Sequence, residues 1–382
     1  MRLSSLLSLA LAVTLTACDF SGDRGRDDSD FVYVLTNDPD GNAVQAYSSD
    51  GNGGLESLGA FETGGDGGTI TGTPDPLASQ NALNITEDGR FVLAVNNGSS
   101  SLTSFRVLGN GRLRRVDVVE TGTSPLSVDT WGDLVYVANN GADGMPGAGS
   151  VSGFKLSNNG RLTPIEGASQ PGTDAPVTFP GSIAVSPDGE TVVMTEKATG
   201  RILAYPVLED GALGDPVGVD SPTPTPFGAD FFGETLLVSE ANAPGGMVVE
   251  GGSSASSWRL EGGALEVVSP AVENGETAAC WIEATPDGRY AYTSNTPEAS
   301  LSLYRFNGDG SLELLDGRAA SLGEMGFSLD IAIAADVLYV LVADPGEVQA
   351  YRIARGGELL PLGTPVTGLV TGEVAGLVTL DR

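Results

Sequence analysis

The 382-residue chain contains no histidine, only two cysteines and only two lysines, Lys155 and Lys197. The absence of histidine excludes a Ser-His-Asp triad, a histidine general base and histidine-bound metals. Gly-x-Ser-x-Gly, Walker A, Gly-x-Gly-x-x-Gly and Cys-x-x-Cys motifs are also absent. Any catalysis must therefore use carboxylates, arginines or Lys197, and we expect no metal and no cofactor.

Basic residues are also scarce, with 19 Lys and Arg against 50 Asp and Glu and a net charge of −31. Such an acidic chain is not expected to bind nucleic acid or anionic lipid headgroups. The composition favours a solvated surface adapted to high salt. Calcium binding at residues 37–42 (NDPDGN) is the alternative, although this stretch lacks the glutamate of an EF-hand loop.

Helical periodicity of useful length occurs only before residue 18, within "MRLSSLLSLALAVTLTAC". This stretch has the layout of a signal peptide and is too short to span a membrane in the mature protein. Its Leu-x-Ala-Cys ending predicts a lipoprotein signal over residues 1–17, lipidation of Cys18 and an acidic tether over residues 18–30. The mature chain would then keep 18 basic and 50 acidic residues, a charge of −32. An ordinary secretory signal with an incidental Cys18 is the alternative.

A repeated hairpin pattern occupies the rest of the chain. "SLTSFRVLGNGRLRRV" (residues 101–116) returns as "SVSGFKLSNNGRLTPI" (residues 150–165), with alternating apolar residues on both sides of a glycine turn. The Gly-x-Leu element recurs at intervals of 47 to 58 residues and ends at Leu55, Leu113, Leu162, Leu213, Leu265, Leu312 and Leu359. Four antiparallel strands per repeat, here named a to d, are typical of a propeller blade.

The first repeat lacks its strand a, whereas "GLVTL" (residues 376–380) follows the last repeat as an unpaired strand. Pairing this strand with residues 31–35 would close the ring and remove its exposed edges. The fold class is therefore all-β, a seven-bladed β-propeller over residues 31–382 that is closed by the C-terminal strand. We expect a monomer.

Over residues 31–382 the chain resembles the seven-bladed lactonase-type propellers, the family of bacterial 6-phosphogluconolactonases and fungal carboxymuconate lactonising enzymes. The resemblance rests on "PGSIAVSPDGETVVMTEKATGRILAY", "TPFG…LLVSEA" and "ACWIEATPDGRYAYTSNT". It implies lactone hydrolysis and a functional glutamate at the end of strand b of blade five, which a one-residue shift places at Glu240. The family's Arg-His and its second histidine are replaced by residues 225–228 (TPFG) and 179–181 (FPG).

The long loops are predicted to share one face, because strands b and d both end on it. They comprise residues 64–80, 139–150, 169–182 and 240–254. Polar residues recur where the b strands reach this face, in the column Thr36, Asn96, Asn139, Glu196, Glu240, Asn295 and Val342. These side chains either bind local backbone or form a polar ring at the channel mouth.

On the second interpretation, Glu240, Glu196 and Lys197 are the candidate catalytic residues, with Lys197 polarising a carbonyl. Candidate ligand-binding residues are Asn96, Asn139, Asn140, Asn295 and Trp281, although Trp281 also suits a buried core position. Cys280 is expected to fill the core rather than to be a reactive thiol.

Two functions remain open. One is an extracytoplasmic, lipid-anchored hydrolase of a lactone or carbohydrate derivative. The other is a non-catalytic envelope module that binds a ligand or a partner protein through the long-loop face.

Overall fold

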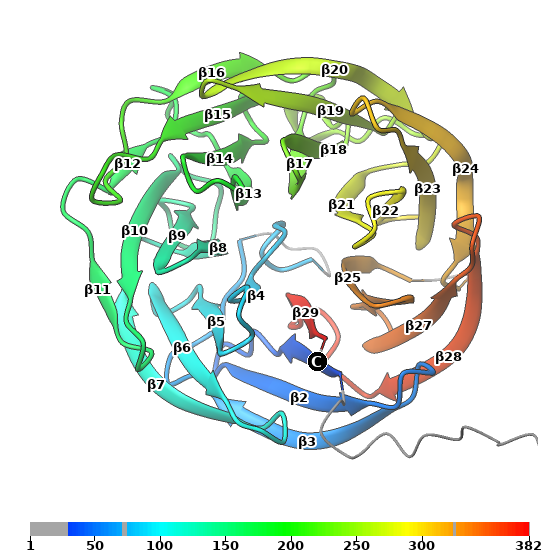
Figure 1. Cartoon of the computed structure of the whole chain (residues 1–382), viewed down its shortest axis with the longest axis horizontal. Coiled ribbons are helices and arrows are strands. Elements are labelled where there is room, and N and C mark those ends of the chain that lie inside the picture. The colour runs from blue at the N-terminus through cyan, green and yellow to red at the C-terminus, as the bar shows by residue number, and fades with distance from the viewer. Residues whose placement is uncertain (1–29, 71–74, 324–325, 382) are drawn as a thin grey trace, which may run out of the picture.

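The computed structural model describes residues 30–70, 75–323 and 326–381, which form a ring of seven antiparallel sheets around a central channel (Figure 1). The predicted signal peptide, Cys18 and all of the tether except Asp30 lie outside these residues. Within the described part of the chain, no helix is long and apolar enough to cross a membrane. The single short 3-10 helix found there is η1 (Pro244–Gly246).

Each sheet is one blade, with strand a nearest the channel and strand d outermost. Blade one comprises β29 (Leu377–Leu380), β1 (Phe31–Leu35), β2 (Ala43–Ser49) and β3 (Leu55–Glu62). Blade two comprises β4 (Leu83–Ile85), β5 (Phe91–Asn96), β6 (Ser101–Val107) and β7 (Leu113–Glu120). Blade three comprises β8 (Pro125–Trp131), β9 (Leu134–Asn139), β10 (Ser150–Leu156), β11 (Leu162–Pro164) and β12 (Gln170–Pro171).

The remaining blades have four strands each. Blade four comprises β13 (Pro180–Val185), β14 (Thr191–Glu196), β15 (Arg201–Pro206) and β16 (Val217–Asp220). Blade five comprises β17 (Pro226–Phe232), β18 (Thr235–Glu240), β19 (Ser254–Glu261) and β20 (Ala264–Glu273). Blade six comprises β21 (Ala279–Ala284), β22 (Tyr290–Asn295), β23 (Ser300–Phe306) and β24 (Leu312–Ser321). Blade seven comprises β25 (Ser328–Ala334), β26 (Val337–Val342), β27 (Glu347–Ile353) and β28 (Leu359–Thr367).

The ring closes as the sequence predicted. Strand β29 pairs with β1 in antiparallel register, from Phe31 opposite Leu380 to Val34 opposite Leu377, so the first and last described strands lie side by side (Figure 1). The outer strand of blade three differs from the prediction, because it is split into β11 and β12, which both pair with β10. Pro164 ends β11 at this gap, and proline has no backbone N–H with which to continue a ladder.

The blades are held together by their b strands, which are buried on both faces because each blade lies between two others. Strands β5, β9 and β14 are buried along their whole length, whereas β3 on the outside alternates between half-buried and exposed residues. Three b-strand tyrosines also donate hydrogen bonds to the c–d turn of the next blade: Tyr33 to Gly111 (3.0 Å), Tyr136 to Gly211 (2.8 Å) and Tyr292 to Gly357 (2.7 Å). The sequence analysis did not recognise this tyrosine pattern.

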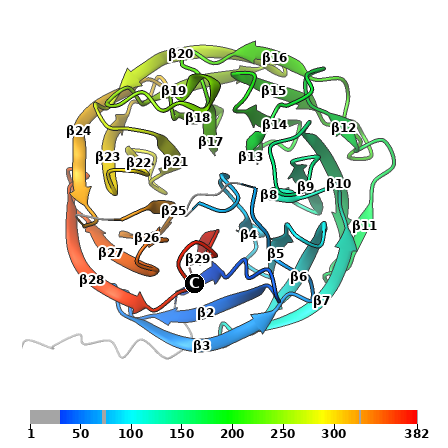
Figure 2. The same cartoon turned by 180° about the vertical axis from the view of Figure 1, so that it is seen from behind.

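A segment of the blade one–blade two connection, residues 76–81, crosses the centre of the ring, and we call it the plug. Both views show the chain before β4 reaching into the channel (Figures 1 and 2). Gln80 exchanges two hydrogen bonds with the backbone of Ile282 in blade six, of 2.9 and 3.1 Å. Ser79 donates to the carbonyl oxygen of Leu126 in blade three at 2.7 Å. The plug thereby separates a pocket on the long-loop face from a pocket on the opposite, turn face.

Candidate functional site

The polar column at the ends of the b strands is directed between blades. Five of its members are fully buried: Asn96, Asn139, Glu196, Glu240 and Asn295. None of these five lines the pocket on either side of the plug. They bind hydroxyl, amide and backbone groups of strand c and of the connection from the preceding blade. The structure therefore does not bring these side chains together as a ring around the channel mouth.

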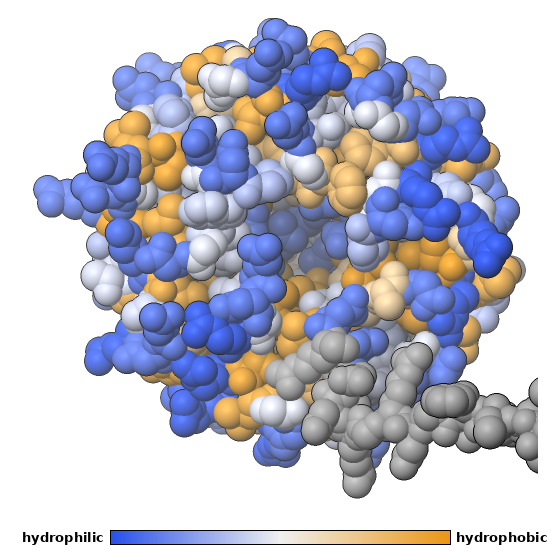
Figure 3. Space-filling model, in the orientation of Figure 1, coloured by the Kyte–Doolittle hydropathy of each residue, from blue (hydrophilic) through white to orange (hydrophobic). Residues whose placement is uncertain are grey.

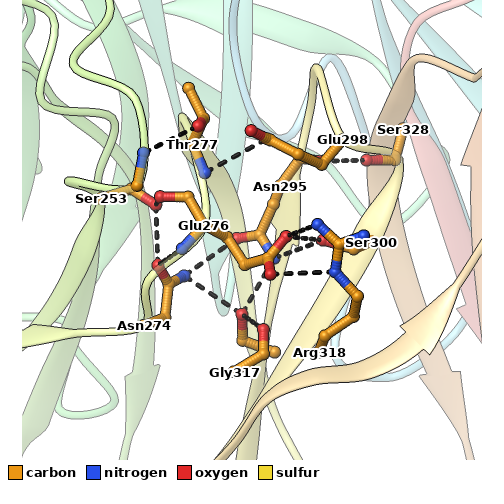
Figure 4. Close-up of polar contacts among 12 residues, drawn as sticks. Ser253, Asn274, Glu276, Thr277, Asn295, Glu298, Ser300, Gly317, Arg318 and Ser328 are labelled. Atoms are coloured by element: carbon orange, nitrogen blue, oxygen red, sulfur yellow. Dashed lines mark hydrogen bonds and ion pairs between the residues drawn. The ribbon is translucent and has the colours of Figure 1, made fainter.

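Asn295 illustrates this arrangement (Figure 4). Its amide nitrogen donates to Ser300 and Ser302 of strand β23 at 3.1 and 2.9 Å. Its amide oxygen accepts a 3.0 Å hydrogen bond from Asn274, which follows the outer strand of blade five. Arg318 on strand β24 adds a second link between the two blades, because it donates two hydrogen bonds, of 2.9 and 2.6 Å, to Glu276 in the connection from blade five. Asn295 thus joins blades five and six.

The other predicted ligand-binding asparagines have similar roles. Asn96 donates to Ser101 and Thr103 of its own blade and accepts from Asn42 of blade one. Asn139 donates to Ser152 at 3.0 Å, and its buried amide oxygen has no hydrogen-bond partner. Asn140 donates to the carbonyl oxygens of Ala142 and Met145, so it shapes the long loop of residues 139–150. A ligand-binding role for these asparagines stays a prediction.

Glu240 is held by three serines, since its carboxylate accepts hydrogen bonds from Ser221, Ser254 and Ser256, the last at 2.5 Å. Burial raises the pKa of Glu240 to about 7, while the serine hydrogen bonds act in the opposite direction. The groups that shift its pKa do not include Glu196.

Glu196 has a separate set of partners. Its carboxylate accepts hydrogen bonds from the backbone N–H and the hydroxyl of Thr173, at 2.8 and 2.6 Å, and from the hydroxyl of Thr199 at 2.7 Å. These contacts tie blade four to its connection from blade three. The structure does not bring Glu196 and Glu240 together, and a catalytic role for either stays a prediction.

The third catalytic candidate, Lys197, has a different position, on the wall of a pocket of about 480 Å³. All four predicted long loops contribute to this pocket, so the expectation that they gather on one face is confirmed. Its walls are largely apolar and are made by Ala78, Pro146, Val177, Phe179, Lys197, Ala198, Thr225, Phe227, Ala241, Ala243, Gly245, Gly246, Val248, Ala278 and Cys280.

Lys197 is buried and carries the only charge on these walls. Its Nζ atom donates to the carbonyl oxygen of Ala78 in the plug. The same atom lies 3.5 Å from the ring centre of Phe179 and 4.7 Å from that of Phe227. Burial lowers the pKa of Lys197 to about 7, while the Asp75 carboxylate acts in the opposite direction. A lysine in this environment exchanges a proton near neutral pH.

Asp75 immediately precedes the plug and is a functional candidate that the sequence analysis missed. It is 6% exposed, and its carboxylate accepts a 2.8 Å hydrogen bond from the backbone N–H of Ala78. Burial raises the pKa of Asp75, and the nearby Lys197 lowers it. An acid with a raised pKa beside a base with a lowered pKa is common both at functional sites and in buried ion pairs. Its only trace in the sequence is an aspartate within a long loop.

Trp281 and Cys280 both belong to the core beside this pocket. Trp281 is 1% exposed, packs against Phe227 with ring centres 5.1 Å apart, and donates to the carbonyl oxygen of Ser79 in the plug. The Cys280 thiol lines the pocket, but burial raises its pKa to about 12, so it stays protonated. Both residues fit the core alternative, and Trp281 supports the plug instead of lining the pocket.

On the turn face the channel is lined by carboxyl groups, and Figure 3 shows the ring hollowed at its centre. Asp129, Asp230 and Glu283 border this second pocket, of about 450 Å³, on strands a of three blades. Asp129 and Asp230 each accept a hydrogen bond from the backbone N–H of the next inner strand, at 2.7 and 3.0 Å. Within the described residues, no group of three or more acidic, cysteine or histidine side chains is placed to hold a metal ion.

The possible calcium loop of residues 37–42 is also bound internally. Asn42 accepts a 2.9 Å hydrogen bond from the backbone N–H of Asn37, and Asp38 accepts one from Asp40. Asn42 also donates to the backbone of Val95 in blade two. These side chains stabilise the turn and its contact with the next blade, as Asn and Asp commonly do.

Comparison with known proteins agrees with the fold. A family model described as "Lactonase, 7-bladed beta-propeller" matches residues 41–146. A candidate 6-phosphogluconolactonase of Bacteroides uniformis superposes with a TM-score of 0.68 at 21% identity, covering 93% of this chain and 100% of that chain. The periplasmic gluconolactonase of Pseudomonas aeruginosa superposes with a TM-score of 0.69 at 18% identity, covering 93% and 99%. No curated protein sequence matches. The predicted resemblance to lactonase-type propellers is thereby confirmed, and at these identities the structural likeness shows the fold alone.

Proposed function

We propose that the protein opens a lactone, or a related sugar-derived ester, in the pocket on the long-loop face, with Lys197 as the acting group. The observation that carries this proposal is the position of Lys197, a buried amine that is the only charged side chain among the largely apolar residues lining the pocket. Burial also lowers its pKa toward neutrality. The match of residues 41–146 to a lactonase family supports the reaction type. Glu196 and Glu240, whose carboxylates are turned between blades, are not needed for it.

The uncharged amine of Lys197 acts as a general base. It takes a proton from a water molecule, whose oxygen attacks the lactone carbonyl carbon to form a tetrahedral intermediate. The ring C–O bond then breaks, and the ammonium group of Lys197 returns the proton to the leaving alkoxide. The net reaction consumes one water molecule and yields one hydroxy acid, so the lysine is regenerated. Apolar walls favour the uncharged amine before the reaction.

A second function, binding without catalysis, is favoured by the position of the two glutamates. The carboxylates of both glutamates are bound by hydroxyl and backbone groups of strand c and of the loops, and neither glutamate lines the pocket, so Lys197 has no carboxylate beside it on the pocket wall. In that case the ammonium form of Lys197 would hold the carboxylate or carbonyl oxygen of a ligand, or of a partner protein's segment. The two functions differ in whether the ligand is released intact.

We further propose that the protein works outside the cytoplasm, attached to a membrane by lipid on Cys18. The sequence of residues 1–18 supports this location. Asp30, the first described residue, lies beside the c–d turn of blade one, where its carbonyl oxygen accepts a hydrogen bond from Ser49. The chain therefore enters the ring on the turn face, opposite the face on which the long-loop pocket opens.

The test is hydrolysis of a panel of lactones by the wild-type protein and by Lys197→Met, with Lys155→Met as the matched control. Lys155 is the only other lysine and lies exposed on strand β10. We expect hydrolysis above the buffer rate, a loss of about 10²-fold or more in Lys197→Met, and no loss in Lys155→Met. Melting temperatures of the three proteins would confirm that each is folded. Hydrolysis at the buffer rate by the wild type would contradict the proposal and leave the binding function.

A further inference from the structure

Exposed apolar side chains gather around the mouth of the long-loop pocket. Among the described residues, thirteen large apolar side chains are exposed, and five of them belong to three of the long loops that line this pocket. We call these five the apolar rim: Met145, Val177, Met247, Val248 and Val249. Met247 is 75% exposed and Met145 60%. Isolated exposed apolar residues need no explanation, but a group of them around a pocket indicates a binding surface.

The rim is continuous with the pocket wall. Val177 and Val248 line the pocket directly, and Met145 is the chain neighbour of the lining residue Pro146. Met247 and Val249 flank Val248 on the loop between β18 and β19. Val177 and Val248 are both exposed and lining, so they connect the solvent-exposed loops to the apolar wall around Lys197, whose amine is the only charged group on the wall.

We propose that this pocket takes an amphipathic ligand, with a carbonyl or carboxylate oxygen at Lys197 and an unbranched aliphatic chain that lies along the apolar rim. This deepens the proposed function, because it makes the substrate a lactone that carries an aliphatic chain. A pocket with one polar anchor and apolar walls orients such a molecule by its head group, and burial of the chain supplies most of the affinity.

The walls argue against a phosphorylated or unmodified sugar. A sugar would bring several hydroxyl groups against carbon-lined walls, and buried hydroxyls without partners are strongly unfavourable. A phosphate dianion would meet a single buried amine and no arginine, because none lines the pocket. Phosphate is usually bound by several donors at once. The aliphatic class is the one that fits both the rim and the wall.

The experiment measures the affinity of γ-lactones with side chains of zero, four and eight carbons by isothermal titration calorimetry. Met247→Ser and Val248→Ser are the rim variants, and Leu208→Ser is the matched control. Leu208 is 51% exposed but lies in the c–d turn of blade four, on the turn face. All three positions are exposed, so folding should be unaffected.

We expect the dissociation constant to fall by about threefold for each methylene that becomes buried. Met247→Ser and Val248→Ser should weaken binding of the eight-carbon lactone by roughly threefold to tenfold, and binding of the unsubstituted lactone by less. Leu208→Ser should bind like the wild type. An affinity that does not depend on chain length, or that the rim variants leave unchanged, would overturn the inference.

Hydrolysis of each lactone, followed in parallel by acid release, separates this inference from the proposed function. Chain-dependent binding without hydrolysis would support the aliphatic ligand and contradict the lactonase proposal. Equal hydrolysis of short and long lactones would support the lactonase and contradict the aliphatic ligand. The corresponding fatty acids form a further arm: tighter binding of the acid than of the lactone, again without hydrolysis, identifies a carrier of carboxylates.

Discussion

The Nζ atom of Lys197 donates a hydrogen bond to the carbonyl oxygen of Ala78, a residue 119 positions earlier in the chain. This contact joins the end of strand β14 in blade four to the plug that enters the channel from blade one. It holds the amine at the boundary between an apolar pocket and the polar centre of the ring. The position of the Lys197 amine therefore depends on the plug as much as on its own blade.

The first prediction concerns the pH dependence of hydrolysis. Because burial lowers the pKa of Lys197 to about 7, the uncharged base should accumulate as the pH rises through that value. The rate should increase from pH 6 to pH 8 and then level off, and Lys155→Met should show the same profile. A pH–rate profile that is flat over this range would mean that Lys197 is not the base.

The second prediction concerns ring closure by the C-terminal strand. Deletion of residues 374–382 removes the four paired positions between β1 and β29 and exposes an inner edge of the ring. The lost backbone hydrogen bonds and packing should lower the melting temperature by roughly 5 °C or more. A chain that lacks only Arg382 is the control. An unchanged melting temperature in the longer deletion would show that closure contributes little to stability.

The third prediction concerns buried carboxyl groups on the inner strands of the ring, among them Glu283 on β21 and Asp330 on β25. Burial raises the pKa of Asp330 from 3.8 to about 8, and burial with two neighbouring acids raises that of Glu283 well above its usual value. The folded protein therefore keeps protons that the unfolded chain has already released. Its free energy of unfolding should fall as the pH rises from about 4 to about 8.

Glu283→Gln tests this dependence, because the amide cannot ionise. Urea denaturation should show a smaller loss of stability between pH 5 and pH 8 in this variant than in the wild type. Glu266→Gln, at an exposed position of β20, should behave like the wild type. If the free energy of unfolding changed with pH in the same way in all three proteins, Glu283 would not contribute to the pH dependence of stability.

The fourth prediction concerns the lipid anchor. Cys18→Ser removes the only thiol that the lipoprotein signal offers, so the protein should move from the membrane fraction to the soluble fraction. Cys280→Ser is the control, since this second cysteine is buried in the ring. Membrane association that persists in Cys18→Ser would contradict the anchor.

The fifth prediction concerns salt. With 50 acidic and 19 basic residues, repulsion between surface charges should destabilise the folded protein in dilute buffer. The melting temperature should rise from about 0.05 to 2 M potassium chloride as the charges are screened. A constant melting temperature would mean that the acidic surface is not an adaptation to salt.

The sequence by itself determined the fold, because the relevant signals are local. Alternating apolar residues and glycine turns define the strands of each blade, and the unpaired strand at residues 376–380 identifies the closing partner of β1. The lengths of the connections were enough to predict which loops share a face. All four loops do contribute to one pocket.

Only the tertiary structure decided which polar residues face that pocket. Glu196 and Lys197 are adjacent in the sequence, but successive side chains at a strand end point to opposite sides. Glu196 is therefore directed to Thr173 between blades, and Lys197 to the pocket. Which of these two side chains faces the pocket depends on the packing of the neighbouring blade, and no local sequence pattern indicates it.

The plug is the clearest example of a feature that depends on contacts between blades. Residues 76–81 look like an ordinary loop, yet the hydrogen bonds of Gln80 to Ile282 and of Ser79 to Leu126 place them across the channel. The plug lies between the apolar pocket at Lys197 and the acidic channel at Glu283. It is held there because backbone groups of blades three and six satisfy the polar side chains of one short segment, and this can happen only once the ring has closed around it.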